Sequence, residues 1–174
     1  YSQEDGHLIS RKEQKVRNGM TNEELMKIHL LFHITNVNTF MYRTKKIQEI
    51  NGFDDIPACQ EYVLMQKTLE ARMSLGYIPQ IHVKCYIGKG ERVSTNIKKV
   101  KAQKYLISQK KRYFNLLTLS ERRTVLCRNY GVLMNIYLKN NRYLKAIMYL
   151  IMAAITSPVN AFKWFVEYRK KIGA

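Results

Sequence analysis

The sequence lacks several features that mark particular classes of protein. Its three cysteines lie far apart, without a CxxC pair or a histidine at metal-binding spacing, which excludes a zinc site and a disulfide framework and indicates a reducing compartment. Eight glycines and three prolines are too few for a collagen-like or low-complexity chain. The longest apolar run, residues 146–155, is shorter than the roughly 20 residues that cross a bilayer, and no signal-peptide pattern is present. What remains is an ordinary globular composition of 174 residues.

Acidic residues are scarce in the second half of the chain. Residues 95–174 hold 17 Lys and Arg but only two acidic residues, Glu121 and Glu167, which gives a charge of +15. Residues 1–94 are nearly balanced, with 13 basic and 11 acidic residues. This distribution predicts a near-neutral body joined to a basic tail, and the tail is expected to bind an anionic partner.

The first part of the body shows the patterns of a helix, a strand and a short helix. Thr21 and Glu24 match a capping box, and apolar residues at helical spacing then predict a helix over residues 22–33. His29 and His33 lie four residues apart on it. This spacing suits a metal, but no third ligand is in sight, and we interpret both as helix-surface residues. Residues 37–43 alternate as in a strand, and residues 44–50 predict a short helix.

The second part of the body predicts a longer helix followed by a strand. In the segment CQEYVLMQKTLEARMSL, residues 59–75, one helix face carries Tyr62, Met65 and Leu69. We expect Tyr62 and Tyr86 to pack in the core or at its rim rather than to stack on a sugar. After Gly76 the chain alternates as in a half-buried strand over residues 78–87 and leads into the basic loop GKGERVST.

A series of short motifs resembles a known enzyme family. The series is the turn NGFDD, the pair Gln60-Glu61 in the first turn of a helix, the basic Lys67 on that helix, and the loop IGKGERVS after the strand. Over residues 37–94 it is similar to the C-terminal half of the catalytic domain of family 2 glycosyltransferases. The resemblance implies an α/β fold, with a partial GT-A (Rossmann-like) half over residues 1–94 and an appended α-helical tail over residues 95–174.

Three positions depart from the family pattern, and one motif is missing. Glu61 stands where the family usually has Asp, Lys67 where it has Arg, and Gly88 where many members have a His that helps to hold a metal. The Asp-x-Asp motif of the nucleotide-binding half does not occur. We expect an excised portion of a longer enzyme; the alternative is that a partner supplies the other half. A divalent metal, Mn²⁺ or Mg²⁺, is expected only in the complete enzyme.

The resemblance also implies roles for individual residues. Glu61 matches the base that takes a proton from the acceptor hydroxyl, and the positive end of its helix favours the ionised carboxylate; stabilising that helix end is the alternative role. Asp54 and Asp55 are either turn residues or part of the acceptor pocket. The guanidinium group of Arg92 is suited to bind two phosphate oxygens at once. The candidate substrate-binding residues are Asp54, Asp55, Gln60, Lys67, Arg92 and Ser94, with Lys89 and Asn38 as weaker candidates.

The sequence of the tail, residues 95–174, predicts four helices. The first covers about residues 96–114, the second starts at Ser120 and Glu121 and runs to about residue 138, the third spans residues 143–156, and Pro158 opens a fourth over residues 159–172. The fourth mixes aromatic and basic residues, as interfacial helices do. Its candidate membrane-binding residues are Phe162, Lys163, Trp164, Phe165, Arg169 and Lys170. The alternative is a small helical bundle with a solvated basic face.

Two hypotheses from different functional classes follow. The first is part of an inverting glycosyltransferase that transfers a sugar from a nucleotide-sugar donor to a cell-surface polysaccharide or lipid-linked glycan. This hypothesis places the protein in the cytoplasm, peripheral on the inner face of the cell membrane. The second is a non-catalytic basic module that binds an anionic membrane or nucleic acid. Nucleic acid is the weaker partner, because no known binding module is recognisable and the aromatic residues accompany long aliphatic ones.

Overall fold

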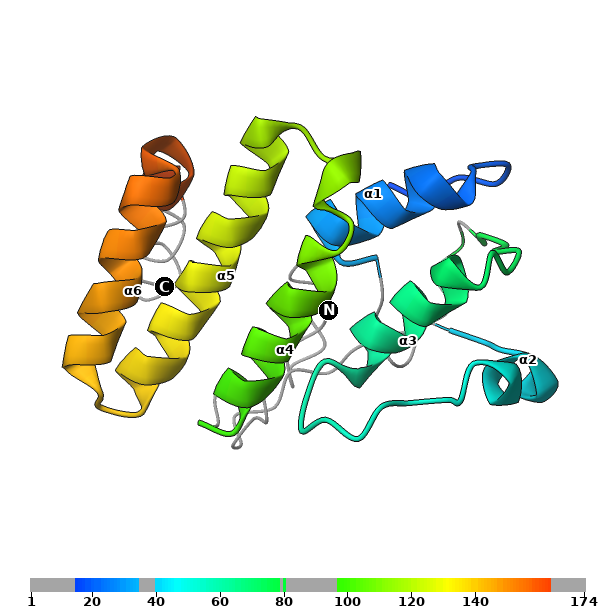
Figure 1. Cartoon of the computed structure of the whole chain (residues 1–174), viewed down its shortest axis with the longest axis horizontal. Coiled ribbons are helices and arrows are strands. Elements are labelled where there is room, and N and C mark those ends of the chain that lie inside the picture. The colour runs from blue at the N-terminus through cyan, green and yellow to red at the C-terminus, as the bar shows by residue number, and fades with distance from the viewer. Residues whose placement is uncertain (1–14, 35–39, 79, 81–96, 164–174) are drawn as a thin grey trace. The chain divides into compact units, whose positions relative to one another are not determined.

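The computed structural model describes residues 15–34, 40–78, 80 and 97–163, and their regular structure is helical (Figure 1). The chain divides into two compact units, one of Tyr1–Asp55 with Gln60–Glu91 and one of Ile56–Cys59 with Arg92–Ala174. In chain order the helices are α1 (Asn22–Phe32), α2 (Thr44–Glu49), α3 (Gln60–Glu70), α4 (Lys99–Lys111), the short 3₁₀ helix η3 (Phe114–Leu116), α5 (Leu119–Lys139) and α6 (Tyr143–Thr156).

The predicted α/β fold is wrong for the part of the chain that the structure describes, which contains no strand. Residues 40–43, the described end of the first predicted strand, have no regular structure, and neither do Ile78 and Gln80 of the second. The alternating side chains fit the two faces of a strand, but a strand also needs a neighbour that hydrogen bonds to its backbone, and no described segment supplies one. Residues 37–39, 79 and 81–87 lie outside the described residues.

The first unit is built on α1 and α3, which pack against each other. The capping box predicted for α1 is confirmed: Thr21 Oγ1 accepts from the backbone N–H of Glu24 at 3.2 Å, and Glu24 Oε2 accepts from the backbone N–H of Thr21 at 2.8 Å. The predicted apolar face of α3 is also confirmed as core. The buried apolar residues of the two helices are Leu25, Met26, Leu30, Tyr62, Val63, Leu64, Met65 and Leu69.

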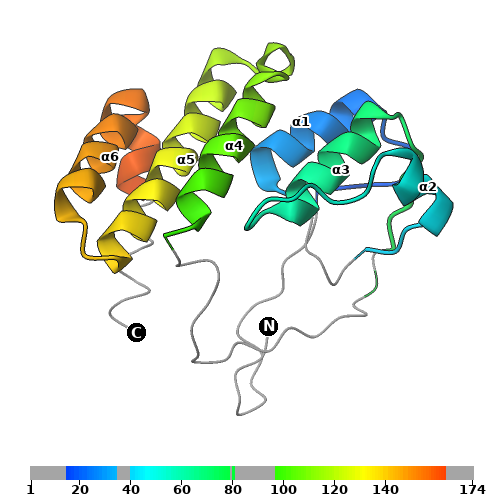
Figure 2. The ribbon, with the colours of Figure 1, turned by 60° about the horizontal axis from the view of Figure 1, so that its bottom comes forward.

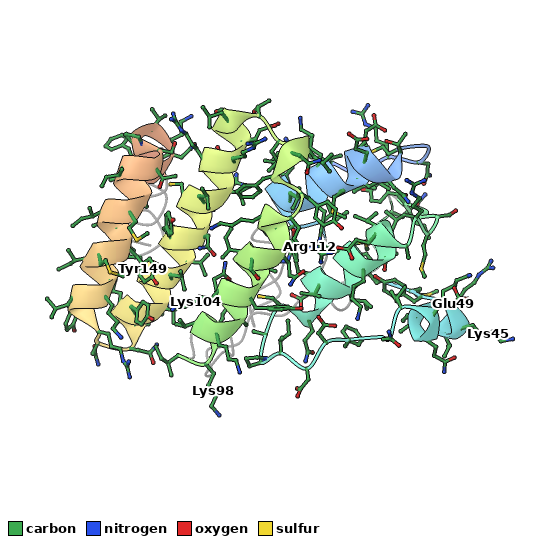
Figure 3. The ribbon with its side chains drawn as sticks, in the orientation of Figure 1. Lys45, Glu49, Lys98, Lys104, Arg112 and Tyr149 are labelled. Carbon is green, nitrogen blue, oxygen red and sulfur yellow. The ribbon has the colours of Figure 1, made fainter. Side chains whose placement is uncertain are left out.

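In the second unit α4, α5 and α6 follow one another and lie side by side (Figures 1 and 2). α5 and α6 form a helical hairpin around a buried cluster. Tyr149 of α6 lies between these two helices (Figure 3) and stacks on Tyr137 of α5 with the ring centroids 5.6 Å apart. The bounds predicted for the third tail helix are confirmed by α6. The cluster consists of Leu133, Met134, Tyr137, Ala146 and Tyr149.

The start of α5 differs from the prediction. Thr118, rather than Ser120, caps the helix: its side chain accepts from the backbone N–H of Glu121 at 3.3 Å, and Glu121 Oε2 accepts from the backbone N–H of Thr118 at 2.8 Å. A capping box joins residues three positions apart. Glu121 therefore pairs with Thr118 and not with Ser120, which directly precedes Glu121.

A buried hydrogen bond links α4 to α5. Nε2 of Gln103 donates to Oδ1 of Asn129 at 2.9 Å, and both side chains are almost fully buried. On α4, Ala102 and Leu106 are buried as well. Two amides thus satisfy each other inside an otherwise apolar contact.

The chain after α6 turns back toward α5. The described part of the next helical segment covers residues 158–163, which agrees with the helix predicted to open at Pro158. Asn160 Nδ2 donates to Oγ1 of Thr124, on α5, at 3.0 Å. Among the helices that the structure describes, none has the length and apolar character needed to cross a membrane.

Candidate functional site

The NGFDD motif forms a tight turn between α2 and α3. Asn51 and Gly52 adopt positive φ angles of 57° and 54°, the left-handed region that glycine and asparagine tolerate best. The backbone N–H of Gly52 donates to the carbonyl of Ile47 at 2.9 Å, which ends α2. The chain then continues through Phe53 and Asp54 toward the start of α3.

Lys67 of α3 holds this turn in place. Its Nζ donates to the backbone carbonyl of Gly52 at 2.8 Å and to Asp54 Oδ1 at 2.9 Å. The lysine and aspartate side chains are 23% and 27% exposed, so water screens the ion pair less than at an open surface. Because the two bonds are to residues on either side of Phe53, they fix the position of its backbone against α3.

We expect Lys67→Met to lower the free energy of unfolding by about 1–3 kcal/mol, because it removes two hydrogen bonds made by a partly buried charged group. Lys67→Arg should retain most of the stability, since a guanidinium also carries the charge and several donors. Lys46→Met provides the matched control, because Lys46 pairs with Glu49 at 2.7 Å with both side chains more than half exposed. That control should cost less than about 1 kcal/mol. Urea denaturation measures all three, and equal losses for Lys67→Met and Lys46→Met would contradict the role given to Lys67.

Glu61 lies at the wall of a small cavity in the same unit. The cavity has a volume of about 110 Å³ and is lined by Phe40, Tyr42, Phe53, Glu61 and Leu64. Leu64 is buried, whereas Glu61 keeps part of its surface exposed. Among the described residues that line the cavity, Glu61 supplies the only carboxylate.

Tyr42, which lines the cavity, carries a hydroxyl group that is held by α3. Burial raises the pKa of its hydroxyl, and a hydrogen bond with the Thr68 side chain opposes this in part. The Thr68 hydroxyl also donates to the carbonyl of Leu64 at 2.9 Å. The phenol therefore stays neutral at ordinary pH, and its hydroxyl is held by Thr68, two helical turns after Glu61 on α3.

The cavity thus combines aromatic walls with one carboxylate. Apolar walls with a few directed polar groups are typical of small-molecule sites. Aromatic rings offer flat apolar faces, on which the C–H face of a sugar can pack, while a carboxylate accepts hydrogen bonds from hydroxyl groups. The arrangement suits a polyhydroxylated ligand of which one ring, or part of one, enters the cavity.

The structure brings some of the predicted site residues together and separates others. Glu61 and Lys67 both lie on α3, where Glu61 lines the cavity and Lys67 binds the turn that carries Phe53. Asp54 pairs with Lys67. Asp55 and Gln60 are exposed and do not line the cavity. Arg92, Ser94, Lys89 and Asn38 lie outside the described residues.

Sequence analysis missed the aromatic walls, Phe40, Tyr42 and Phe53. Phe40 and Tyr42 are two residues apart in the segment interpreted as a strand, a spacing that places both side chains on the same side of an extended chain. Phe53 is the central residue of NGFDD, but only the tie between the turn and α3 brings it to the cavity.

The interpretation of His29 as a surface residue is wrong. His29 is fully buried, its Nε2 lies 3.0 Å from the backbone carbonyl of Tyr62, and its ring stacks on the Tyr62 ring with centroids 3.9 Å apart. Burial strongly raises the pKa of the Tyr62 hydroxyl. The ring of His33 meets the Tyr62 ring edge-on, with the ring centroids 4.7 Å apart.

In the described ranges no three His, Cys, Asp or Glu residues are grouped so that they could hold a metal ion.

A lysine of the other unit also has a displaced pKa. Burial lowers the pKa of Lys110 to about 8 from its ordinary 10.5; the charge of Arg128 lowers it further, and Cys59 acts in the opposite direction. At neutral pH the amine therefore remains mainly protonated.

Comparison of this chain with protein-family models, with curated proteins and with solved structures finds no match.

Proposed function

We propose that the chain is the acceptor-side part of an inverting glycosyltransferase, with Glu61 as the catalytic base. The donor is a nucleotide-sugar, and the acceptor is a cell-surface polysaccharide or a lipid-linked glycan. The observation that carries the proposal is the carboxylate of Glu61, which lies in the first turn of α3 at the wall of an aromatic cavity.

Glu61 would act on the acceptor hydroxyl. As the hydroxyl oxygen attacks the anomeric carbon of the donor, its proton passes to the Glu61 carboxylate. The bond from the anomeric carbon to the diphosphate oxygen breaks on the opposite side, and the nucleoside diphosphate leaves with the bonding electron pair. Attack opposite the leaving group inverts the anomeric centre.

Two features of the chain support this reaction over a purely structural role for Glu61. The resemblance to family 2 glycosyltransferases matches Glu61 to the base and Lys67 to a basic residue on the same helix. In the structure Lys67 fixes the turn that carries Phe53, one wall of the cavity that Glu61 lines. Of the matched residues, Glu61 thus lines the cavity and Lys67 holds the turn that carries another of its walls.

The divalent metal that the resemblance implies is not matched by a metal site in the described residues. Their acidic, histidine and cysteine side chains form no group of three that could hold Mn²⁺ or Mg²⁺. We therefore derive no step through a metal ion.

The same proposal places the protein in the cytoplasm, on the inner face of the cell membrane. It is supported by the +15 charge of residues 95–174, because the cytoplasmic leaflet carries anionic lipids.

We expect the chain to bind simple glycosides through the cavity. Saturation-transfer NMR with the methyl glycosides of glucose, galactose and N-acetylglucosamine should detect at least one ligand with a millimolar dissociation constant. Phe53→Ala should weaken this binding by about two- to tenfold, the loss expected for one aromatic contact. Phe162→Ala is the matched control, because Phe162 is 69% exposed and belongs to the other unit. Absence of saturation transfer, or equal weakening by both variants, would contradict the proposed site.

A further inference from the structure

α6 is apolar on all of its sides. Between Tyr143 and Thr156 its only charged residue is Lys145. A helix of this kind is stable when apolar surroundings cover it all round. α5 covers only one side of α6, and the other side remains to be accounted for.

One side of α6 is covered within the unit. Ala146, Tyr149 and Ala153, spaced by three and four residues, are buried. Tyr149 stacks on Tyr137 of α5. This face of α6 therefore belongs to the core of the hairpin.

The opposite face is exposed, and all of its large side chains are apolar. At the same helical spacing it carries an outer stripe, which we define as Leu144, Ile147, Met148, Ile151 and Ile155. Their exposed fractions run from 46% for Met148 to 86% for Leu144. Of α4, α5 and α6, α6 is the outermost, and no described helix of the unit lies on its far side (Figures 1 and 2).

The segment that follows α6 does not cover the outer stripe in its described part. The hydrogen bond from Asn160 to Thr124 directs it toward α5, on the buried side of α6. Its own apolar residues Val159 and Phe162 are 66% and 69% exposed. These two side chains are therefore also uncovered, on a segment separate from the outer stripe.

Charge identifies the partner. Exposed basic residues flank the outer stripe: Lys139 and Arg142 precede α6, Lys145 lies in its first turn, and Lys163 follows it. The described part of the second unit contains a single acidic residue, Glu121, which caps α5. An anionic bilayer fits both features, because it takes up apolar side chains and its headgroups attract Lys and Arg, each of which strengthens binding about fivefold.

The length of α6 excludes a membrane-spanning helix, and the charge of the chain opposes a second copy as the partner. The 14 residues of α6 extend about 21 Å, less than the roughly 30 Å of hydrocarbon, so the helix fits in the plane of the interface rather than across the membrane. A second copy of this chain, with its own charge of +17, would be repelled. We propose that α6 docks on an anionic membrane surface with its outer stripe in the boundary between headgroups and acyl chains.

This inference differs from the membrane contact predicted from the sequence. The prediction placed the contact at Phe162–Lys170, whereas the docking face proposed here lies on α6. Trp164, Phe165, Arg169 and Lys170 lie outside the described residues and do not enter the argument. The inference is also independent of glycosyl transfer.

Co-sedimentation with phosphatidylcholine vesicles, with and without phosphatidylserine, tests the inference on the full chain. The wild type should bind only the vesicles that contain phosphatidylserine. The double variant Ile147→Gln/Ile151→Gln should bind at least about tenfold more weakly, since two apolar side chains no longer insert. Lys139→Gln/Lys145→Gln should weaken binding and make it less sensitive to salt.

The control is Leu119→Gln/Ile78→Gln, which removes two apolar side chains of similar exposure, 64% and 67%, that do not belong to α6. It should bind like the wild type, and circular dichroism should show unchanged thermal midpoints for all variants. Three results would overturn the proposal: no binding of the wild type to phosphatidylserine vesicles, binding that is unaffected by Ile147→Gln/Ile151→Gln, or equal losses in the control. Concentration-dependent dimers of the wild type that are lost in the double variant, without vesicle binding, would assign the face to self-association instead.

Discussion

Glu61→Gln is expected to lower the rate of sugar transfer by about 10²- to 10⁴-fold, because the amide keeps the size of the side chain but cannot accept the proton of the acceptor hydroxyl. The assay requires a polypeptide in which this chain is joined to a nucleotide-binding half. The base acts in the transition state, so kcat should fall while KM for the donor stays nearly constant. Loss of one negative charge near the start of α3 should change the free energy of unfolding by no more than about 1 kcal/mol.

Two further variants make this result specific. Glu61→Asp introduces the residue that family 2 glycosyltransferases usually carry, so it should retain part of the activity. Glu49→Gln makes the same chemical change on the exposed side of α2, outside the cavity lining, and should leave the rate unchanged. A fully active Glu61→Gln enzyme would show that another group takes the proton, with Asp54 or Asp55 as the next candidates.

The second large effect concerns the α5–α6 hairpin. Leu133 on α5 is 2% exposed and belongs to the buried cluster shared with α6. Leu133→Ala should lower the free energy of unfolding by about 2–5 kcal/mol, since it removes buried apolar contacts and leaves a cavity that neighbouring side chains fill only in part. Urea denaturation followed by circular dichroism measures this loss.

The matched variant is Leu144→Ala on the outer stripe of α6. Leu144 is 86% exposed, so the same truncation should change the unfolding free energy by less than about 0.5 kcal/mol. The pair compares one chemical change on the two sides of the hairpin. If Leu144→Ala costs as much as Leu133→Ala in the absence of lipid, then the outer stripe is covered in solution, and the description of α6 as open on that face fails.

The helices could be predicted from the sequence because their signals are local. The box formed by Thr21 and Glu24 fixes the start of α1, and apolar residues at helical spacing identify α3 and α6. In the described residues the predicted strands are not formed, because alternation describes only one segment, while a strand depends on a neighbour that can lie anywhere in the chain. Residues 40–43 have the alternating pattern of a strand, but no described segment pairs with them.

The candidate site was predictable only in part, for a related reason. The resemblance identified Glu61 and Lys67 because both belong to a motif along one helix. The aromatic walls come from separate segments, and they line the cavity because of tertiary contacts that no spacing rule contains. His29 shows the same limit: its position on α1 suggests a surface residue, but its stacking on Tyr62 of α3 buries it.

The hydrogen bond between Gln103 and Asn129 has a consequence for how α4 and α5 align. A slip of one helix along the other by a single turn, about 5.4 Å, would still bring apolar side chains together, because aliphatic contacts are not directional. The same slip would separate the two amides and leave each buried, at a cost of about 1–3 kcal/mol per group. The polar pair therefore selects one register among several that hydrophobic packing alone would tolerate.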